Sequence, residues 1–310
     1  MAGVAQALLP AGLDVAAFDD LHDDVARWLP LISDIAAAHV PAGTPVRPAA
    51  EGTVLVALLG SSQVIKLYPP LLRDHFEFEQ ETLRCLQPLA LAVPTPRLLA
   101  SGERDGWPFL LMSQLPGRVL TAAWPGLAED QKCALLQRLG ELVTQVQTSP
   151  LGRLPQLAPD WPQFLADQRR RCAERQRRTG LPVHLLAGLA AFVEGPLPTG
   201  PAVLLTGEYT PMNLLHDGQN LCGLFDFGDG LVGPAAYDWL GPLCFMAAGH
   251  RDRCDAFLRG LGQSLDRSWR LPLLRLLLLH RYSHLPAQLA LPGWQQATDF
   301  ETLAEQLWPD

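Results

Sequence analysis

The sequence predicts an α+β protein with two lobes, a small β-rich N-terminal lobe and a larger, mainly helical C-terminal lobe. The first third of the chain carries short apolar runs of strand-like composition, whereas the remainder is dominated by helical periodicity. The length of 310 residues is enough for two domains of ordinary size. We expect residues 1–113 to form the N-terminal lobe, including a helical extension, and residues 114–310 to form the helical lobe.

The N-terminal lobe is predicted to begin with two short helices and to continue with a β-hairpin. Residues 1 to about 45 have the pattern of two helical pieces that end in a proline-rich stretch. The β-rich runs at 53–59 and 64–68 flank Gly60-Ser-Ser-Gln63, whose composition is typical of a turn. Two prolines then end the second strand, so the hairpin is well delimited.

A helix over residues 71–87 and a buried strand over Trp107–Met112 complete this lobe. The helix is indicated by apolar residues spaced three and four apart, namely Leu72, Phe76, Leu83 and Leu86. Leu115-Pro-Gly117 breaks the strand. The boundary between the lobes is therefore expected near Gln114.

The helical lobe is predicted to contain three long helices, over residues 127–148, 161–179 and 183–194. A short strand at 203–205 follows. The apolar segments 213–216 and 221–225 flank Asp217-Gly218, a strong signal for a two-residue hairpin turn. Residues 235–310 return to a helical pattern.

Composition and charge exclude several classes of protein. A hydrophobic fraction of 48% with 18% charged residues excludes extensive disorder. The net charge of −8 argues against a nucleic-acid partner, which would require a basic face. The N-terminus lacks a basic segment, and the apolar stretch Leu271–His280 is short and interrupted by Pro272 and Arg275. We therefore expect a cytoplasmic protein with no secretory signal and no membrane partner.

The cysteines indicate neither a zinc site nor a disulfide framework. None of the six forms a CxxC pair, and most lie among apolar residues. We expect free, mostly buried thiols in a reducing compartment, at Cys85, Cys133, Cys172, Cys222, Cys244 and Cys254.

Lys66 is the first candidate functional residue. Only Lys66 and Lys132 are lysines among 24 basic residues, so a lysine inside an apolar strand calls for an explanation. In an extended strand Lys66 shares a face with Val64 and Tyr68. A lysine that protects a sheet edge from aggregation is the structural alternative.

Glu79 is the expected partner of Lys66. It falls in the apolar stripe of the 71–87 helix, three residues after Phe76 and four before Leu83. A carboxylate on a buried face must find a cation or become protonated. We therefore predict a buried Lys66–Glu79 pair, in which the lysine can bind phosphate. A carboxylate at the rim of the stripe is the alternative.

A second cluster is predicted around the 213–225 hairpin. Glu208 and Asn213 lie in one tight loop, and Asp226 follows the second hairpin strand. Because a hairpin brings its ends together, we expect Asn213 and Asp226 to lie side by side. Two oxygen ligands suit Mg²⁺, which completes its shell with water and phosphate oxygens. Glu208 can then face an incoming hydroxyl group.

These residues resemble the aminoglycoside phosphotransferase family, whose members share the protein-kinase-like fold and include choline-kinase-like small-molecule kinases. The resemblance covers residues 50–245 and rests on the order of several motifs. They are Val64-Ile-Lys-Leu67, the Glu79 helix, Val93-Pro-Thr-Pro-Arg97, Trp107–Gly117, Glu208–Asn213, Gly223–Asp229 and Gly233–Asp238.

The resemblance implies a role for each position. Lys66 would hold the α- and β-phosphates of ATP, oriented by Glu79. A hinge giving backbone hydrogen bonds to adenine would consist of Leu111, Met112, Ser113 and Gln114. Asn213 and Asp226 would bind Mg²⁺. The resemblance places Glu208 at the catalytic aspartate and Asp238 as a buried support of the catalytic loop.

The chain departs from the family in two places. Thr206-Gly-Glu208 stands where the family usually has His-Gly-Asp, and the added methylene displaces the carboxylate on a scale to which catalysis is sensitive. The glycine-rich cover over the phosphates is also thin, with only Gly52 and Thr53 in the expected place.

Two further features have structural and functional interpretations. Six arginines between 169 and 178 form a solvated helix face, with an anionic substrate or partner site as the alternative. His280 and His284 are four apart on a predicted helix and could share a face. They lack a clear third metal ligand, and a place near the substrate pocket is the other interpretation.

The sequence therefore predicts a Mg²⁺-dependent small-molecule kinase that transfers the γ-phosphoryl group of ATP, or of GTP, to a hydroxyl group. The partners are a nucleotide and a small hydroxyl-bearing substrate. The alternative is a nucleotide-binding pseudokinase or interaction module, favoured by Thr206 and Glu208. The charge balance of residues 230–310 does not favour a polycationic acceptor.

Overall fold

The N-terminal lobe is built on a five-stranded antiparallel sheet in the order β1-β2-β3-β5-β4. The computed structural model describes residues 9–10, 12–49, 52–263 and 267–310, so the start of the first predicted helical piece lies outside the described residues. The strands are β1 (Val46–Pro48), β2 (Leu55–Leu59), β3 (Gln63–Leu67), β4 (Leu98–Arg104) and β5 (Trp107–Ser113). The predicted hairpin is confirmed as the β2–β3 pair.

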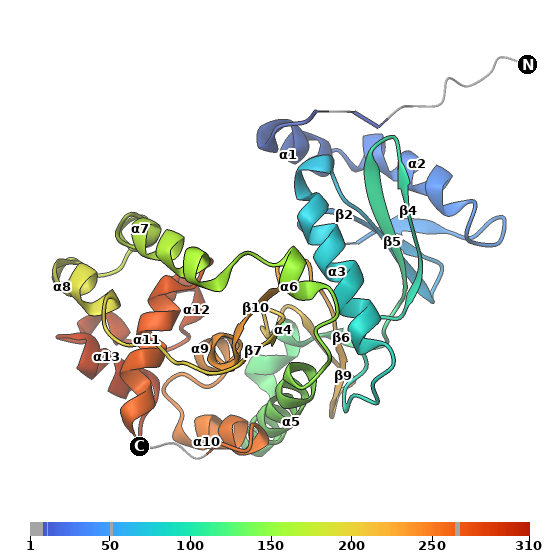
Figure 1. Ribbon diagram of the computed structural model, residues 1–310. Helices are drawn as coiled ribbons and strands as arrows, with labels where there is room; N and C mark the ends of the chain where they lie inside the picture. Colours follow the sequence, from blue (N-terminus) through green and yellow to red (C-terminus); the bar gives the residue numbers. More distant parts are fainter. Residues whose placement is uncertain (1–8, 11, 50–51, 264–266) are drawn as a thin grey trace, which may run out of the picture.

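Helices cover both faces of this sheet (Figure 1). On one face, α1 (Val15–Asp23) and α2 (Val25–Ala36) pack against Ile65 and other strand residues. On the other, α3 (Arg73–Leu86) crosses the sheet and turns its buried Glu79 inward. The alternation of side chains along β3 thus places Ile65 and Lys66 on opposite faces of the sheet.

The helical lobe carries its long helices where the periodicity predicted them. Its helices are α4 (Leu120–Ala123), α5 (Glu129–Gln147), α6 (Leu154–Leu157), α7 (Trp161–Thr179), α8 (Val183–Val193), α9 (Leu240–Phe245), α10 (Arg251–Gly260), α11 (Arg270–Leu279), α12 (Leu285–Gln288) and α13 (Phe300–Leu307). Short 3₁₀ turns occur at Pro70–Leu72, Trp124–Gly126, Ala235–Tyr237, Arg267–Trp269 and Trp294–Gln296.

The limits of α7 show how local chemistry sets these boundaries. The side chain of Asp160 accepts a hydrogen bond from the backbone N–H of Gln163, which caps the first turn. Gly180 ends the helix in the left-handed conformation, with φ of +92°. Both ends agree with the predicted range 161–179.

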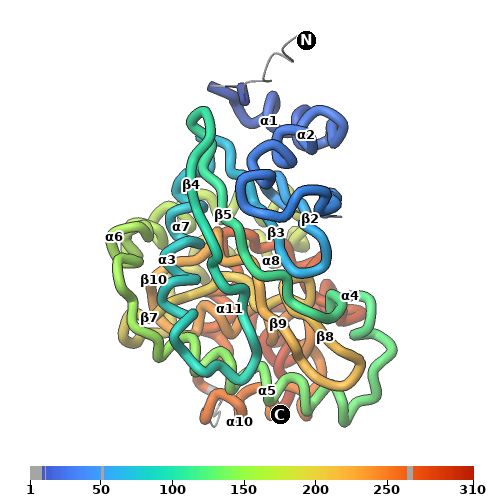
Figure 2. The backbone as a smooth tube through the Cα atoms, turned by 90° about the vertical axis from the view of Figure 1, so that its right-hand side faces the viewer, coloured from blue at the N-terminus to red at the C-terminus, as the bar shows by residue number. Residues whose placement is uncertain are grey.

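Two small sheets sit between the five-stranded sheet and the long helices (Figure 2). One contains β6 (Arg118–Val119), β8 (Leu214–His216) and β9 (Leu221–Leu224). The other pairs β7 (Ala202–Leu205) with β10 (Leu231–Pro234). The predicted 213–225 hairpin is confirmed as β8–β9, and the loop that follows β7 connects the two small sheets.

The turn of the β8–β9 hairpin differs from the prediction. Four residues, Asp217–Asn220, separate the strands, because His216 pairs with Leu221. The Asp217 carboxylate accepts the backbone N–H groups of Gln219 and Asn220, each at 2.8 Å. This side-chain acceptor stabilises a longer turn than the Asp-Gly pair alone predicts.

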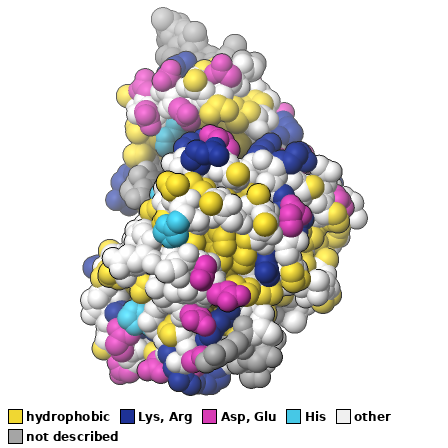
Figure 3. All heavy atoms as spheres, turned by 90° about the vertical axis from the view of Figure 1, so that its left-hand side faces the viewer, with side chains coloured by type: hydrophobic (Ala, Val, Ile, Leu, Met, Phe, Trp, Pro, Cys, Tyr) yellow, Lys and Arg dark blue, Asp and Glu magenta, His cyan; other side chains and the backbone are white. Residues whose placement is uncertain are grey.

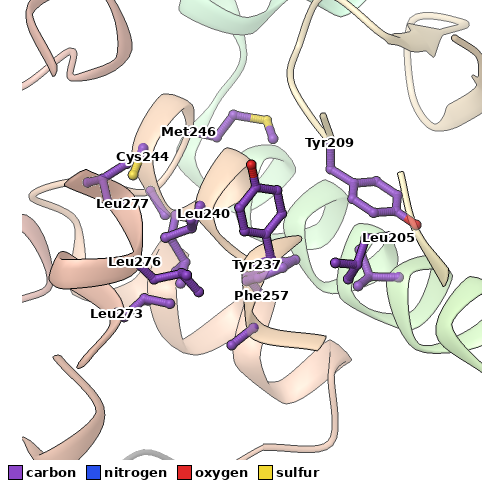
Figure 4. Close-up of a cluster of buried hydrophobic side chains, with 14 of the residues drawn as sticks. Leu205, Tyr209, Tyr237, Leu240, Cys244, Met246, Phe257, Leu273, Leu276 and Leu277 are labelled. Carbon is purple, nitrogen blue, oxygen red and sulfur yellow. The ribbon is translucent and has the colours of Figure 1, made fainter. Parts of the chain in front are cut away.

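A large hydrophobic core fills the helical lobe and continues under the inner face of the sheet, where it includes Tyr68, Phe76 and Met112. Figure 4 shows part of this core, with Tyr209 beside Leu205 at the end of β7. Among the described residues, no helix has the length and apolar character needed to cross a bilayer. The cysteines are free, as predicted, and Cys172, Cys244 and Cys254 are fully buried.

Candidate active site

The predicted pair of Lys66 and Glu79 is confirmed. The Lys66 Nζ atom lies 2.8 Å from Oε1 and 3.0 Å from Oε2 of Glu79. The hydroxyl of Tyr68, on the same face of the chain as Lys66, donates to Glu79 Oε2 at 2.6 Å. Strand β3 and helix α3 therefore hold one buried ammonium and one buried carboxylate against each other.

Asp226 is the third member of this group. Its Oδ1 atom accepts a hydrogen bond from Lys66 Nζ at 2.7 Å, although the two residues lie in different lobes. Asp226 adopts a left-handed backbone conformation with φ of +72°, which is uncommon for a residue other than glycine. The chain thus turns sharply after β9 and directs the carboxylate toward the N-terminal lobe.

The charges of this group stabilise one another. Burial opposes the charge of Lys66, but the Asp226 and Glu79 carboxylates outweigh it and raise the pKa of Lys66 above its ordinary value. The Lys66 ammonium lowers the pKa of Asp226. Burial raises the pKa of Glu79, and Lys66 opposes that shift. Lys66 is therefore a fixed cation that faces the junction of the lobes.

The β8–β9 hairpin brings Asn213 and the Asp226 segment to the same end, as predicted. Leu214 pairs with Leu224, and the Phe225 N–H donates to the Asn213 carbonyl oxygen at 3.1 Å. The Asn213 Nδ2 atom donates to the backbone oxygen and to Oε2 of Glu208, at 3.2 and 3.3 Å. Because the amide nitrogen is used in this way, the Asn213 Oδ1 atom is left as a possible metal ligand.

The loop that carries Glu208 is held by hydrogen bonds from its backbone to Asp238. The two oxygens of this buried carboxylate accept the backbone N–H groups of Thr206 and Gly207, at 3.0 and 2.9 Å. Burial raises the pKa of Asp238 to about 7, and the two N–H groups oppose that shift. Gly207 has φ of +80°, so the loop turns there in a conformation that favours glycine.

Glu208 lies in a half-buried position beside other carboxylates. Burial is the main cause that raises its pKa to about 7, and the charges of Asp229 and Asp226 add to it. The next residue, Tyr209, is fully buried and anchors the loop in the core (Figure 4). The carboxylate of Glu208 is therefore positioned by buried residues on both sides.

The positions expected to contact the base and phosphates of a nucleotide lie on or next to the strands that neighbour β3, which carries Lys66. Leu111, Met112 and Ser113 end strand β5, and Gln114 follows it. The N–H of Ser113 donates to Arg97 and that of Gln114 to Ser62. Gly52 and Thr53 are exposed just before β2.

The predictions for the α7 arginines and for the two histidines, His280 and His284, have different outcomes. The arginines of α7 lie mostly on an exposed helix face, as predicted, and Figure 3 shows basic side chains on this side of the molecule. The prediction that His280 and His284 share a helix is wrong. His280 follows the last residue of α11 and His284 caps α12, because a turn with a Ser283–His280 backbone hydrogen bond separates them.

His280 is instead a buried aromatic residue. Its ring stacks on Tyr237 at a centroid distance of 4.5 Å, and its Nδ1 atom accepts the Tyr282 N–H at 3.2 Å. Burial, with help from Arg281, lowers the pKa of His280 to about 3. No group of three histidine, cysteine or acidic side chains suited to a metal occurs in the described part of the chain.

Sequence reasoning gave no role to a cluster around Asp229. Tyr282 donates to Asp229 Oδ1 at 2.6 Å, and Arg281 and His75 lie 3.5 and 3.7 Å from the same oxygen. The signal available in the sequence was a second acid three residues after Asp226. Its partners come from α3 and from the α11–α12 turn, which no sequence pattern connects.

The chain is similar to solved aminoglycoside kinases over most of its length. The GDP complex of aminoglycoside 2'-phosphotransferase-IIIa has a TM-score of 0.66 at 17% identity, with 90% of this chain and 98% of that chain covered. The streptomycin–ATP complex of APH(2")-IIa has a TM-score of 0.60 at 15% identity, with 94% of this chain and 100% of that chain covered. APH(3'')-Id from Streptomyces rimosus, in complex with ADP and streptomycin, has a TM-score of 0.56 at 18% identity, with 82% of this chain and 98% of that chain covered.

At these identities the structures show a shared fold, which confirms the predicted two-lobed, kinase-like architecture. No curated protein matches the sequence. A sequence model described as the phosphotransferase enzyme family matches residues 43–305, which is most of the chain. The chain therefore belongs to the phosphotransferase enzyme family and has the enzyme class of a small-molecule kinase.

Proposed function

We propose that this protein is a Mg²⁺-dependent kinase that transfers the γ-phosphoryl group of ATP or GTP to a hydroxyl group of a small molecule. The observation that carries the proposal is the position of Lys66 Nζ, which contacts Glu79 in one lobe and Asp226 in the other. A phosphoryl-transfer site consists mainly of such fixed charges, because catalysis depends on positioning and charge neutralisation.

The nucleotide would bind between the lobes, with the division at residues 113 and 114. Lys66 would contact the α- and β-phosphates, and the segment Leu111–Gln114 would contact the base. Gly52 and Thr53 would cover the phosphates. Solved relatives that are described as complexes with ATP, ADP or GDP support a purine nucleotide as the donor.

The residues present fit a magnesium ion. Asp226 uses one carboxylate oxygen for Lys66, which leaves the second oxygen, and Asn213 has its amide oxygen available. Two hard oxygen ligands are sufficient for Mg²⁺ when water and phosphate complete the shell. Bound there, the ion would neutralise phosphate charge. Lys66, Asn213 and Asp226 would then hold the phosphates from two sides.

Glu208 would face the acceptor. Its carboxylate is fixed by the Asn213 amide and by the loop that Asp238 supports. A carboxylate in this position can accept a hydrogen bond from the hydroxyl group that attacks the γ-phosphorus. Asp238 would act as a positioning residue, because its carboxylate accepts the backbone N–H groups of the loop.

A nucleotide-binding protein without phosphoryl transfer is the second candidate. Two residues favour it, Thr206 and Glu208, which replace the histidine and aspartate usual in the family the sequence resembles. Glu208 keeps the carboxylate, and Asp238 receives the backbone hydrogen bonds of the loop directly. The geometry of the loop therefore favours the active kinase.

The proposed function is tested by nucleotide binding followed by transfer. Thermal stabilisation by ATP and by GTP is measured with Mg²⁺ and with a chelator, and γ-labelled nucleotide is then offered with a panel of hydroxyl compounds. We expect Mg²⁺-dependent stabilisation and label in an acceptor. Stabilisation with no transfer to any acceptor or to water would support the second candidate.

A further inference from the structure

The carboxylate of Asp229 joins three elements next to the candidate catalytic loop. Its Oδ1 atom accepts a hydrogen bond from the Tyr282 hydroxyl at 2.6 Å and lies 3.5 Å from Nη1 of Arg281. His75 of α3 approaches the same oxygen at 3.7 Å. Tyr282 and Arg281 belong to the turn between α11 and α12. Asp229 thus fixes that turn against the segment that begins at Asp226.

This cluster lies beside the loop that carries Glu208. A side chain at Gly207 would approach the backbone oxygen of Asp229 to 3.0 Å, so Asp229 packs directly on the loop that carries Glu208. Arg281 and Asp229 are both close enough to Glu208 to shift its pKa, in opposite directions. A hydroxyl group at Glu208 would therefore bring the rest of its molecule near Arg281.

Arg281 is held rigidly, but its guanidinium remains accessible. The guanidinium lies over the ring of Phe164 at 5.4 Å and over that of Tyr282 at 5.9 Å. The backbone N–H of Arg281 donates to the Tyr237 hydroxyl at 3.3 Å. The side chain keeps 22% of its surface exposed. Packing on two rings fixes the plane of the guanidinium without using its N–H donors.

The donors of Arg281 are mostly unused. A guanidinium offers five N–H groups in a planar fork that matches carboxylate and phosphate oxygens. Among the described residues, only Asp229 and the Tyr237 hydroxyl approach it with acceptor oxygens, and they can occupy at most two of the five. By contrast, the nearby carboxylates have partners: Asp226 contacts Lys66, and Asp229 contacts Tyr282.

We propose that Arg281 binds an anionic group, a carboxylate or a phosphate, on the hydroxyl-bearing acceptor. This inference rests on the proposed function and deepens it by naming the substrate class, a hydroxy acid or a phosphorylated alcohol. The ammonium groups of a polycationic acceptor would find no partner in Arg281 and could pair only with the carboxylates of Glu208 and Asp229. The aromatic ring of Tyr282, 46% exposed, can contact the body of such a molecule.

The test uses compounds that share one sugar ring and differ in charge. Glucuronate carries a carboxylate, glucose 6-phosphate carries a phosphate, glucose is neutral and glucosamine is cationic. Phosphoryl transfer to each is measured with saturating nucleotide and Mg²⁺, and kcat/KM is compared between compounds. The two anionic compounds distinguish a carboxylate from a phosphate as the group that Arg281 binds.

Wild-type protein is expected to prefer at least one anionic compound over glucose by about 10- to 100-fold in kcat/KM, the range for a hydrogen-bonded charge. In Arg281→Gln this ratio should fall toward one, through KM of the anionic compound, whereas Arg281→Lys should keep part of it. The matched control is Arg178→Gln on the exposed face of α7, which should keep the full preference.

Results that contradict the role of Arg281 can be told apart from results that contradict the kinase function. Transfer that favours glucose or glucosamine, or a preference that Arg281→Gln leaves intact, would overturn the role of Arg281 and leave the kinase assignment standing. If no compound is phosphorylated, calorimetric titration of the ADP-loaded protein with glucuronate and glucose 6-phosphate tests whether Arg281 binds an anionic group. Binding that Arg281→Gln abolishes supports the anionic site, and absence of binding by wild type contradicts it.

Discussion

Lys66 and Asp226 are 160 positions apart in the chain, and their side chains meet at 2.7 Å. Because Lys66 also contacts Glu79, one ammonium connects the sheet lobe, helix α3 and the segment after β9. The contact places the expected phosphate ligand beside the expected metal ligand.

Lys66→Ala is expected to weaken nucleotide binding by about 10- to 100-fold, because it would remove the proposed charged ligand of the phosphates. Lys66→Arg should not restore binding, since a planar fork replaces a compact ammonium. The measurement is calorimetric titration with ATP or GTP. Lys132→Ala is the matched control, because that buried lysine contacts Glu129 and lies near Trp124, away from the site.

Lys66→Ala should also lower the free energy of unfolding, by about 3–5 kcal/mol, since it leaves Glu79 buried without its cation. Adding Glu79→Gln should recover part of this stability and none of the nucleotide affinity. Unchanged affinity in Lys66→Ala would contradict the assignment of Lys66 to the phosphates.

Asn213→Ala and Asp226→Asn are each expected to reduce the part of nucleotide binding that depends on Mg²⁺, because the first removes a proposed oxygen ligand and the second removes the negative charge of the other. The measurement is the thermal shift produced by nucleotide with Mg²⁺ and with a chelator. Asn220→Ala, at the far end of the same hairpin, is the control, since Asn220 contributes backbone hydrogen bonds to the turn. A wild-type shift that the chelator does not change would argue against a metal site.

Asp238→Asn is expected to slow turnover and lower the free energy of unfolding by about 1–3 kcal/mol, because an amide NH₂ would face one of two backbone donors. Thr206 and Gly207 donate to separate oxygens of Asp238, so only a carboxylate satisfies both. Nucleotide affinity should remain. Asp255→Asn on the exposed face of α10 is the control, and equal effects of both variants on kcat would contradict the positioning role.

The stability of the protein should fall in mild acid because of His280. Burial lowers its pKa from 6.5 to about 3, so the unfolded chain binds a proton that the folded chain does not. The contribution of neutral His280 is complete above pH 6.5 and is lost as the pH falls below that value, by about 2 kcal/mol at pH 5.

His280→Asn keeps an acceptor near the Nδ1 position and removes the titration. Denaturant unfolding at pH 8 and pH 5 should therefore show a smaller loss in the variant than in wild type, by about 2 kcal/mol. Equal losses in the two proteins would show that His280 does not titrate in this way.

The sequence was sufficient for those features that depend on periodicity and on local chemistry. Helix α7 has its predicted limits because Asp160 and Gly180 end it on both sides. The Lys66–Glu79 pair could be predicted because a charge in an apolar stripe requires a partner, and a neighbouring strand offered one. The β8–β9 hairpin followed from two apolar segments around a turn.

Other features depend on packing between distant segments. The contact of Lys66 with Asp226 and the cluster around Asp229 join elements that no spacing relates. The segment from His280 to His284 contains no glycine, so its sequence continues the helical pattern. In the fold, stacking on Tyr237 and the hydrogen bond from Tyr282 hold His280 outside α11 and end that helix.

The most direct measurement is transfer of labelled γ-phosphate to an acceptor by wild type, Glu208→Gln and Glu208→Asp. We expect transfer by wild type and a loss of kcat of about 10²- to 10⁴-fold in Glu208→Gln, with nucleotide affinity retained, because Glu208 is proposed to face the acceptor and not the phosphates. Glu208→Asp should be slower if the loop has adapted to glutamate. No transfer by wild type to any acceptor or to water, together with transfer created by Glu208→Asp, would contradict the account and identify a nucleotide-binding protein that has lost its chemistry.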